Sequence, residues 1–546
     1  MARFSQSTSP LKIYTPQGED LLLPITLTGS ESLGGTFSFT IGAVAPKGSR
    51  VSFREMVGKP ASATVALPGG IERAFHGIVS RFTRHDSDSV FDHYGIELRP
   101  RLHALSLVKR SRVFQNLSAI DIIRQLLASV GGAEFDLASR PPARVTCAQF
   151  RETDLEFFLR LCSEEGLIHY WRHTRDNHHL VITDSTARGP STGAVAYDNS
   201  VGGSLDACRV RSWSLSQSLV PVAVEVGGSH MQMFGQSLGA SAPGPEAVVA
   251  GSVRLEPAGN PGPWEEDGHS PARYFDSVTV SGGDADEALG MVRPEQERRA
   301  RLLATAAAAD SVRAHAEGDC SQLTAGHAVE LQGHPDQSGH WLTVTVSHRL
   351  SVEGSYWAGE PASLIRRVSA ELAPLDLPQA HWPPLPKPRV GGVCTATVVG
   401  PGPMNIDKFG RVQVNFPWDR SAGGESCWVR VAQSWAGKGW GACFWPRVGH
   451  EVVVAFEEGD PDRPVIVGSV YNGANTPPYP MPQSMYIAGW KSLTQDGDPS
   501  SNYHQILMSD EKGAEVVHIH AEGKFITQQE SANVSRKPGL DINFQG

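Results

Sequence analysis

The sequence has few of the features that mark a metalloprotein, a disulfide-stabilised protein or a membrane protein. Its seven cysteines are scattered and never form a Cys-x-x-Cys motif, which argues against a disulfide framework and a thiolate zinc site. It has no signal peptide and no apolar run long enough to span a bilayer. We therefore expect synthesis in a reducing cytosol, and any export must use a route other than a cleaved N-terminal signal.

An excess of positive charge is also missing. The formal net charge is −10, so the chain as a whole has no electrostatic attraction to nucleic acid. Glycine (56) and proline (38) are both abundant, which favours turn-rich β structure over helical bundles. At 546 residues the chain is too long for a single core, so several domains are expected.

Residues 390–482 have the pattern of a small closed β-barrel. Five short β-rich segments, separated by glycine- and proline-containing turns, are typical of an OB-type barrel. These segments are Val393–Val399, Arg411–Phe416, Cys427–Gln433, Glu451–Phe456 and Val465–Tyr471. OB barrels can bind single-stranded nucleic acid, but acidic residues offset the basic ones here. We therefore expect its tryptophans in the core or at an interface, and we interpret the acidic run Glu457–Asp462 as a hairpin turn.

The region before the barrel, residues 1–373, predicts a barrel-like antiparallel β domain and a second β unit. Period-two alternation marks one set of strands between residues 11 and 100 and a second between 328 and 373. We interpret the Gly- and Pro-rich residues 227–262 as a surface excursion, and residues 374–389 as a stiff proline-rich linker.

Three helices are expected within this region. Ser118 is expected to cap the first helix. A capping box of Thr153 and Glu156 is expected to begin the second, because the side chain of each of these two residues can accept a hydrogen bond from the free backbone amide of the other. Pro294 opens the third helix.

Two Gly-x-Ser-x-Gly segments, around Ser191 and Ser237, are the nearest match to a hydrolase motif. A nucleophile elbow needs a strand before the serine and a helix after it. Pro190 disrupts one segment, and a Gly/Pro-rich run follows Ser237. The pair His518 and His520 could chelate a metal where copies of the chain meet on an axis, but we interpret it as exposed strand histidines. We predict no catalytic, cofactor-binding or metal-binding residues.

A series of motifs occurs in one order along nearly the whole chain. In the barrel these are Asp407–Val412, Phe416–Arg420, Ser426–Val431, Pro446–Gly449, Glu458–Pro464 and Val470–Asn472, with Phe114-Gln115, Asp121–Ile123 and Phe150–Phe158 upstream and Asn502–Ala521 downstream. Together they closely resemble the VgrG family, the spikes of bacterial type VI secretion systems, which are related to the hub and spike of contractile phage tails.

This resemblance implies a mainly β fold with minor α structure (α+β). It implies a hub of two β-barrel domains with short helices (1–373), the linker (374–389), an OB-fold domain (390–482) and a short trimeric β-helical stem with a docking tail (483–546).

The resemblance also implies a homotrimeric puncturing spike without enzymatic activity or cofactor. Such a spike assembles on the baseplate in the bacterial cytoplasm, caps a tube of Hcp-like rings and is secreted or injected through target membranes. The resemblance implies that a PAAR-type tip protein, or an effector with its adaptor, binds at the C-terminal end. It implies no nucleic-acid partner.

Alternating apolar residues mark the stem and its tail. We expect the stem strands to have no partner within their own chain, so that three chains pair their edges and bury one apolar face. This predicted trimer core consists of Ile506, Met508, Val517, Ile519, Ala521 and Phe525. In the tail, Leu540, Ile542 and Phe544 alternate with polar residues and are predicted to dock a tip protein or cargo.

Family stems usually continue as a long β-helix, whereas this chain ends soon after the Ile519-His520-Ala521 signature. We therefore expect a short stem, with any toxic activity in a separate cargo protein. The alternatives are a hub or spike of a phage or phage-derived particle, a hydrolase acting on the cell envelope and an OB-type nucleic-acid-binding module. The hydrolase would need paired acids or a catalytic triad in a pocket.

Overall fold

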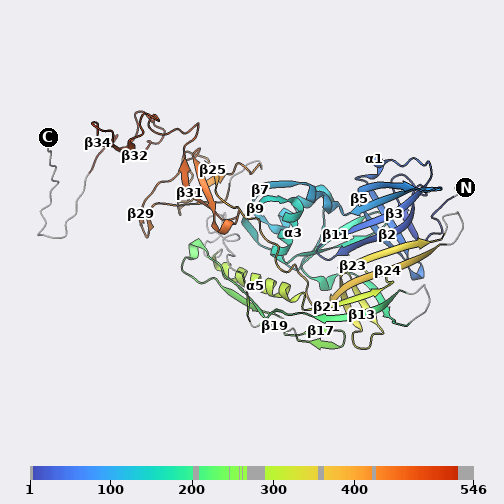
Figure 1. The fold of residues 1–546 in the computed structure, drawn as a ribbon. Coiled ribbons are helices and arrows are strands. Elements are labelled where there is room, and N and C mark those ends of the chain that lie inside the picture. The colour runs from blue at the N-terminus through green and yellow to red at the C-terminus, as the bar shows by residue number, and fades with distance from the viewer. Residues whose placement is uncertain are drawn as a thin grey trace. The chain divides into compact units, whose positions relative to one another are not determined.

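The computed structural model in Figure 1 describes residues 4–200, 208–244, 246–256, 259–260, 262–266, 289–354, 362–420 and 426–526. The chain divides into two compact units. The first comprises Met1–Val393, Asn415–Val429 and Ala455–Val465, and the second comprises Cys394–Val414, Arg430–Val454 and Ile466–Gly546. The domain boundaries proposed from the sequence stay predictions.

One twelve-stranded sheet forms the framework of the first unit. Its order is β1 (Leu11–Tyr14), β4 (Pro60–Ala66), β5 (Glu72–Ser87), β6 (Phe91–Arg99), β3 (Ser38–Pro46), β2 (Leu23–Ser32), β23 (Gly339–Glu353), β22 (Ala328–Gln332), β12 (Ser191–Tyr197), β13 (Arg209–Gln217), β21 (Val312–Gly318) and β24 (Ser363–Pro374). Because β24 also pairs with β23, the strands from β23 to β24 close into a barrel.

The two predicted β regions are confirmed as strands, but they are not two separate barrels. The N-terminal strands continue the same sheet through the antiparallel pair β2–β23, which Figure 1 shows side by side. Alternation along the strands turns one face toward apolar cores. One core surrounds Phe37, Phe39 and Phe75, and the other surrounds the fully buried Trp341 inside the barrel.

The helices begin where the sequence predicts. Ser118 caps α2 (Ala119–Leu127), and Thr153 and Glu156 form the predicted capping box of α3 (Asp154–Glu165). Helix α3 follows directly on β9 (Ala143–Thr153), which pairs with β7 (Lys109–Ser118). The third predicted helix is α5 (Val292–Ala308), and a one-turn helix, α1 (Phe53–Met56), was not expected.

Smaller sheets complete the first unit. One contains β10 (Ile168–His173), β11 (His178–Thr183) and β8 (Glu134–Asp136). Another contains β16 (Ala240–Pro243), β15 (Ala223–Val226) and β20 (Trp264–Glu266). Apolar residues of β15 and β16 pack against α5, so the description of 227–262 as a surface excursion was incomplete. The remaining short pairs are β14 (Val220–Pro221) with β19 (Gly259–Asn260) and β17 (Val248–Ala250) with β18 (Val253–Leu255).

The predicted OB strands are present and form one five-stranded sheet, but in the described residues this sheet is open and does not close into the predicted barrel. Its order is β26 (Gln413–Asn415), β25 (Cys394–Val399), β30 (Glu451–Phe456), β31 (Pro464–Val470) and β27 (Arg430–Val431). An unpredicted hairpin joins β28 (Ala436–Gly437) and β29 (Trp440–Gly441). It leaves Trp435 and Trp440 more than half exposed, so for these two tryptophans only the interface position stays a prediction.

The predicted stem strands are present as β33 (Gln505–Ser509) and β34 (Val516–His520), together with β32 (Ile487–Lys491). The expectation that they lack partners in their own chain was wrong, because they form the antiparallel sheet β32-β33-β34. A tight turn at Gly513, whose φ of 87° favours glycine, lets the chain fold back between β33 and β34. The described residues of this segment form a three-stranded sheet and no β-helix.

Candidate functional site: a buried charge network and an exposed C-terminal sheet

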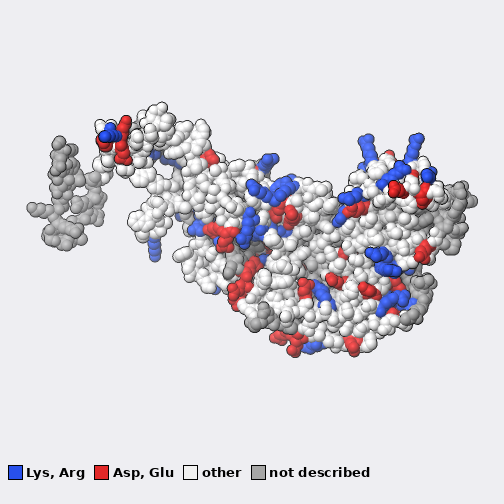
Figure 2. All heavy atoms as spheres, in the orientation of Figure 1, with Lys and Arg blue, Asp and Glu red and all other residues white. Residues whose placement is uncertain are grey.

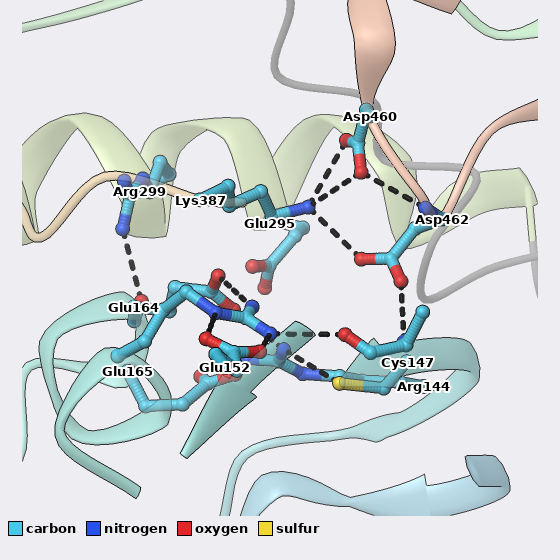
Figure 3. A network of polar contacts seen from close by, with 12 residues as sticks. Arg144, Cys147, Glu152, Glu164, Glu165, Glu295, Arg299, Lys387, Asp460 and Asp462 are labelled. Carbon is cyan, nitrogen blue, oxygen red and sulfur yellow. Dashed lines mark hydrogen bonds and ion pairs between the residues drawn. The ribbon is translucent and has the colours of Figure 1, made fainter. Parts of the chain in front are cut away.

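A network of buried ion pairs joins β9 to α3 in the first unit (Figure 3). The Arg144 side chain is fully buried and donates to Glu164 and Glu165, each at 2.5 Å. Arg160, almost equally buried, contacts Glu164 at 2.8 Å and Glu152 at 2.7 Å. Because buried charges are costly unless paired, these residues fix the strand and the helix in one arrangement.

The network extends from α3 to α5. Arg298 donates to Glu165 at 2.8 Å, and Arg299 donates to the backbone carbonyl of Glu164 at 2.9 Å. Figure 3 shows Arg299 reaching from α5 toward Glu164. Strand β9 and both helices therefore share one set of charged contacts.

The proline-rich linker joins the same network through Lys387. Its ammonium group lies 3.0 Å from Asp460 and 2.9 Å from Asp462, in the acidic turn between β30 and β31 (Figure 3). Asp462 also accepts a hydrogen bond from the backbone N–H of Ala148 on β9 at 2.6 Å. Near Lys387, the Leu385 N–H donates to the Ser163 hydroxyl on α3. The acidic run Glu457–Asp462 is therefore a turn, as predicted. It also anchors the proline-rich linker to the hub through Lys387.

Electrostatics reinforce these contacts. Burial raises the pKa of Glu165, but Arg144 and Arg298 outweigh this effect and hold the pKa below its usual value. Burial lowers the pKa of Arg160, and the carboxylates of Glu164 and Glu152 reverse that effect and raise it. Burial raises the pKa of the Cys147 thiol beside the network to about 12, so it stays protonated and inert.

A second buried polar cluster lies inside the large sheet. Burial raises the pKa of Glu31, but Arg73, at 2.6 Å, and His173, at 3.5 Å, lower it to about 2. His348 packs edge-on against Phe75, and neither of its ring nitrogens has a hydrogen-bond partner in the described structure. Burial lowers the pKa of His348 to about 4.

Replacing His348 by phenylalanine should therefore stabilise the protein. As the pH falls below about 6.5, the unfolded histidine takes up a proton that the folded one refuses until about pH 4, so the wild type loses stability over this window. We expect His348→Phe to raise the free energy of unfolding by about 1–3 kcal/mol, more at pH 5 than at pH 7.5. Urea titrations at both pH values would measure this, with the exposed His85→Phe as the control. A loss of stability at pH 5 would contradict the account.

The C-terminal sheet exposes an apolar face. In the strand register Trp490, Ile506 and Ile519 form one row across the sheet, and Ala488, Met508 and Val517 form the next. Exposures run from 40% at Met508 to 69% at Val517. The four predicted core residues of β33 and β34 therefore do lie on one face, and this face has no cover within the described chain. Trp490 belongs to the same face and was missed, because β32 was not predicted.

The other predicted site residues are placed differently. Ala521 lies just after β34, and Phe525, 65% exposed, lies outside any strand. Leu540, Ile542 and Phe544 lie outside the described residues.

The motifs considered for catalysis or metal binding take ordinary positions. Ser191 begins strand β12, and Ser237 lies in an exposed loop before β16, so neither precedes a helix. His518 and His520 lie with their rings 6.3 Å apart, and their Nδ1 atoms contact the Gln505 side chain and the Tyr503 carbonyl, respectively. No group of His, Cys, Asp and Glu in the described ranges is arranged to hold a metal ion. None of the seven cysteines is joined to another in a disulfide.

The face seen in Figure 2 carries acidic and basic side chains interspersed, without a continuous basic stripe. A mixed surface of this kind gives no footprint for a nucleic-acid backbone. Within the described residues, the helices are too short or too polar to cross a membrane.

Comparison with known proteins decides the family. The family described as phage tail baseplate hub (GPD) matches residues 30–354, and the type VI secretion system/phage-baseplate injector OB domain matches residues 396–471. The type VI secretion system spike protein VgrG1a of Pseudomonas aeruginosa is 34% identical over 535 residues, covering 95% of this chain and 78% of that protein. The chain belongs to the VgrG family of type VI secretion system spike proteins. The two matched regions are a baseplate hub and an OB-domain module.

Solved VgrG-like structures share the fold. The c3393 protein of E. coli, a type VI secretion component with structural similarity to the T4 phage tail proteins gp27 and gp5, has a TM-score of 0.56 at 19% identity. That comparison covers 84% of this chain and all of the other. A Francisella PdpA–VgrG complex gives a TM-score of 0.53 at 8% identity over 94% of this chain and 88% of the other.

Proposed function

We propose that three copies of this chain form a puncturing spike that caps the inner tube and carries a tip protein and effectors across target membranes. The exposed apolar face of β32-β33-β34 is the observation that carries the proposal. Exposure of this face to water is unfavourable, and its burial against another protein surface would lower the free energy. The face consists of Trp490, Ile506, Met508, Val517 and Ile519.

A trimer with three-fold symmetry would cover this face with copies of the same chain. Cyclic symmetry lets the same surface of each copy contribute to one common core. In such an assembly, strands of neighbouring chains can pair with the outer edges of β32 and β34. This pairing removes the exposed sheet edges that promote aggregation.

The charge network supports a mechanical role. Lys387, Asp462, Arg144 and Arg160 bind the linker, the OB turn, β9 and α3 into one block in the first unit. An axial push on the hub is then transmitted through these elements without turnover, catalysis or a cofactor. The proposed partners are an Hcp-like ring and baseplate proteins at the hub, and a PAAR-type tip protein or an adaptor with its effector at the other end.

Secretion of the tube protein tests this function. In bacteria that depend on this chain for secretion, Val517→Asp should abolish release of the tube protein into the medium, because it places a charge in the proposed core. Val516→Asp is the matched control, since it changes the neighbouring residue on the opposite face of β34. Normal secretion by the Val517→Asp strain would refute the proposed assembly.

Removing residues 531–546 tests the proposed docking tail. The alternation of Leu540, Ile542 and Phe544 fits a strand that pairs with another chain. We expect the truncated protein to keep its oligomeric mass while a tip protein or effector no longer co-purifies with it. Full retention of both would show that docking depends on another segment.

A further inference from the structure

The outer face of the large sheet contains a groove that lies apart from the C-terminal sheet on which the proposed assembly was argued. It lies over β2, β23, β24 and β21 and has a volume of about 870 Å³. The strands β2, β23, β24 and β21 are neighbours in this order, each paired with the next (Figure 1). Strand alternation directs Thr28, Ser30, Ser347 and Ser369 outward, opposite to the core residues Leu27 and Leu350.

Two arginines face each other across this groove. Arg349 on β23 and Arg367 on β24 are direct register partners, and both are exposed. No carboxylate of the described chain lies within 4.0 Å of either guanidinium. Like charges directly opposite each other on antiparallel strands destabilise the pair. The free sheet therefore carries a repulsion that a bound anion would relieve.

The other charged groups of the groove are only partly compensated. Arg211 pairs with Asp319 at 3.2 Å, and Glu317 lies 3.4 Å from His315. Glu353 is exposed four residues further along β23 from Arg349, which places it about 13 Å away on an extended strand. Arg349 and Arg367, together with Arg366, which donates to the backbone carbonyl of Ala66, are thus arginines of the groove without a carboxylate partner in the described chain.

This local charge fits carboxylates on a peptide better than a uniform polyanion. Guanidinium groups bind carboxylates in a two-point geometry, and the neighbouring serines can hydrogen-bond a peptide backbone. Asp319, Glu317 and Glu353 interrupt the positive charge of the groove and would repel a continuous phosphate chain. The half-exposed Ile365 adds an apolar contact beside the arginines. A groove of this size has room for several residues of extended peptide.

We propose that this groove binds a carboxylate-bearing peptide segment of a partner protein, with Arg349 and Arg367 each pairing with an acidic side chain. The site lies entirely in the first unit, so it does not depend on how the C-terminal sheets assemble.

Fluorescence anisotropy with a labelled peptide of alternating glutamate and serine tests the proposal on the full-length protein. We expect saturable binding that weakens as salt is raised. The double variant R349Q/R367Q should bind at least tenfold more weakly, because both charged partners are lost. The control R54Q/R81Q, which removes two exposed arginines elsewhere on the first unit, should bind like the wild type.

Two further measurements make the result decisive. The melting temperature of free R349Q/R367Q should stay the same or rise, because the repulsion is removed, which separates lost binding from lost folding. A lysine–serine peptide should not bind. The proposal is overturned if R349Q/R367Q binds the glutamate peptide as tightly as the wild type, if the wild type does not bind it at millimolar concentration, or if inorganic pyrophosphate binds while the peptide does not.

Discussion

Arg160→Met is expected to lower the free energy of unfolding of the first unit by about 3–5 kcal/mol, the usual effect of breaking a buried ion pair on one side. Methionine fills much of the space of the arginine stem, so the loss is mainly electrostatic. It leaves the carboxylates of Glu152 and Glu164 buried beside each other without Arg160. The loss should shrink as the pH falls, because protonation neutralises Glu152, whereas Glu164 keeps its contact with Arg144.

Urea unfolding followed by tryptophan fluorescence would measure this change. Arg301→Met is the matched control on α5, since Arg301 is 66% exposed and lies 3.8 Å from its partner Glu297, and it should change stability by no more than about 0.5 kcal/mol. Adding Glu152→Gln to Arg160→Met should recover part of the loss. Equal effects of Arg160→Met and Arg301→Met would show that the buried network does not hold the hub together.

Val517→Asp is expected to convert the assembled protein into single folded chains. Burying a valine side chain contributes about 1.5–3 kcal/mol, and a trimer loses this at three positions while gaining three buried carboxylates. The equilibrium constant for dissociation should therefore rise by about 10⁴-fold or more, at about 1.4 kcal/mol per factor of ten. Sedimentation velocity over a range of protein concentrations would follow the shift.

Val516→Asp again provides the comparison. Both valines are at least half exposed in one chain, so any difference between the two variants arises from the face that each residue occupies. If both variants, or neither, shift the equilibrium, then the face holding Val517 is not the interface between chains.

Much of the fold was predictable because its signals are local. Period-two alternation located most strands of the large sheet and of the OB domain, since a sheet with one buried face requires it, but it missed β12 and β21. The capping box at Thr153 and Glu156 located the start of α3 because its hydrogen bonds join residues three positions apart.

The charge network was not predictable in the same way. Arg144 and Glu165 meet only through the packing of β9 on α3, and a single charged residue in a sequence suggests an exposed side chain. One signal was available, because Arg160 and Glu164 are four residues apart on a predicted helix.

The stem shows a different limit. Its apolar face was identified by alternation, but the partner of each strand was not, since alternation gives the face of a residue and says nothing about which chain pairs with it.

Measuring the mass of the purified full-length protein by light scattering at micromolar concentration tests the central claim most directly. The account predicts a particle of three times the 58.8 kDa of one chain. A stable, folded monomer of 58.8 kDa at that concentration would contradict it.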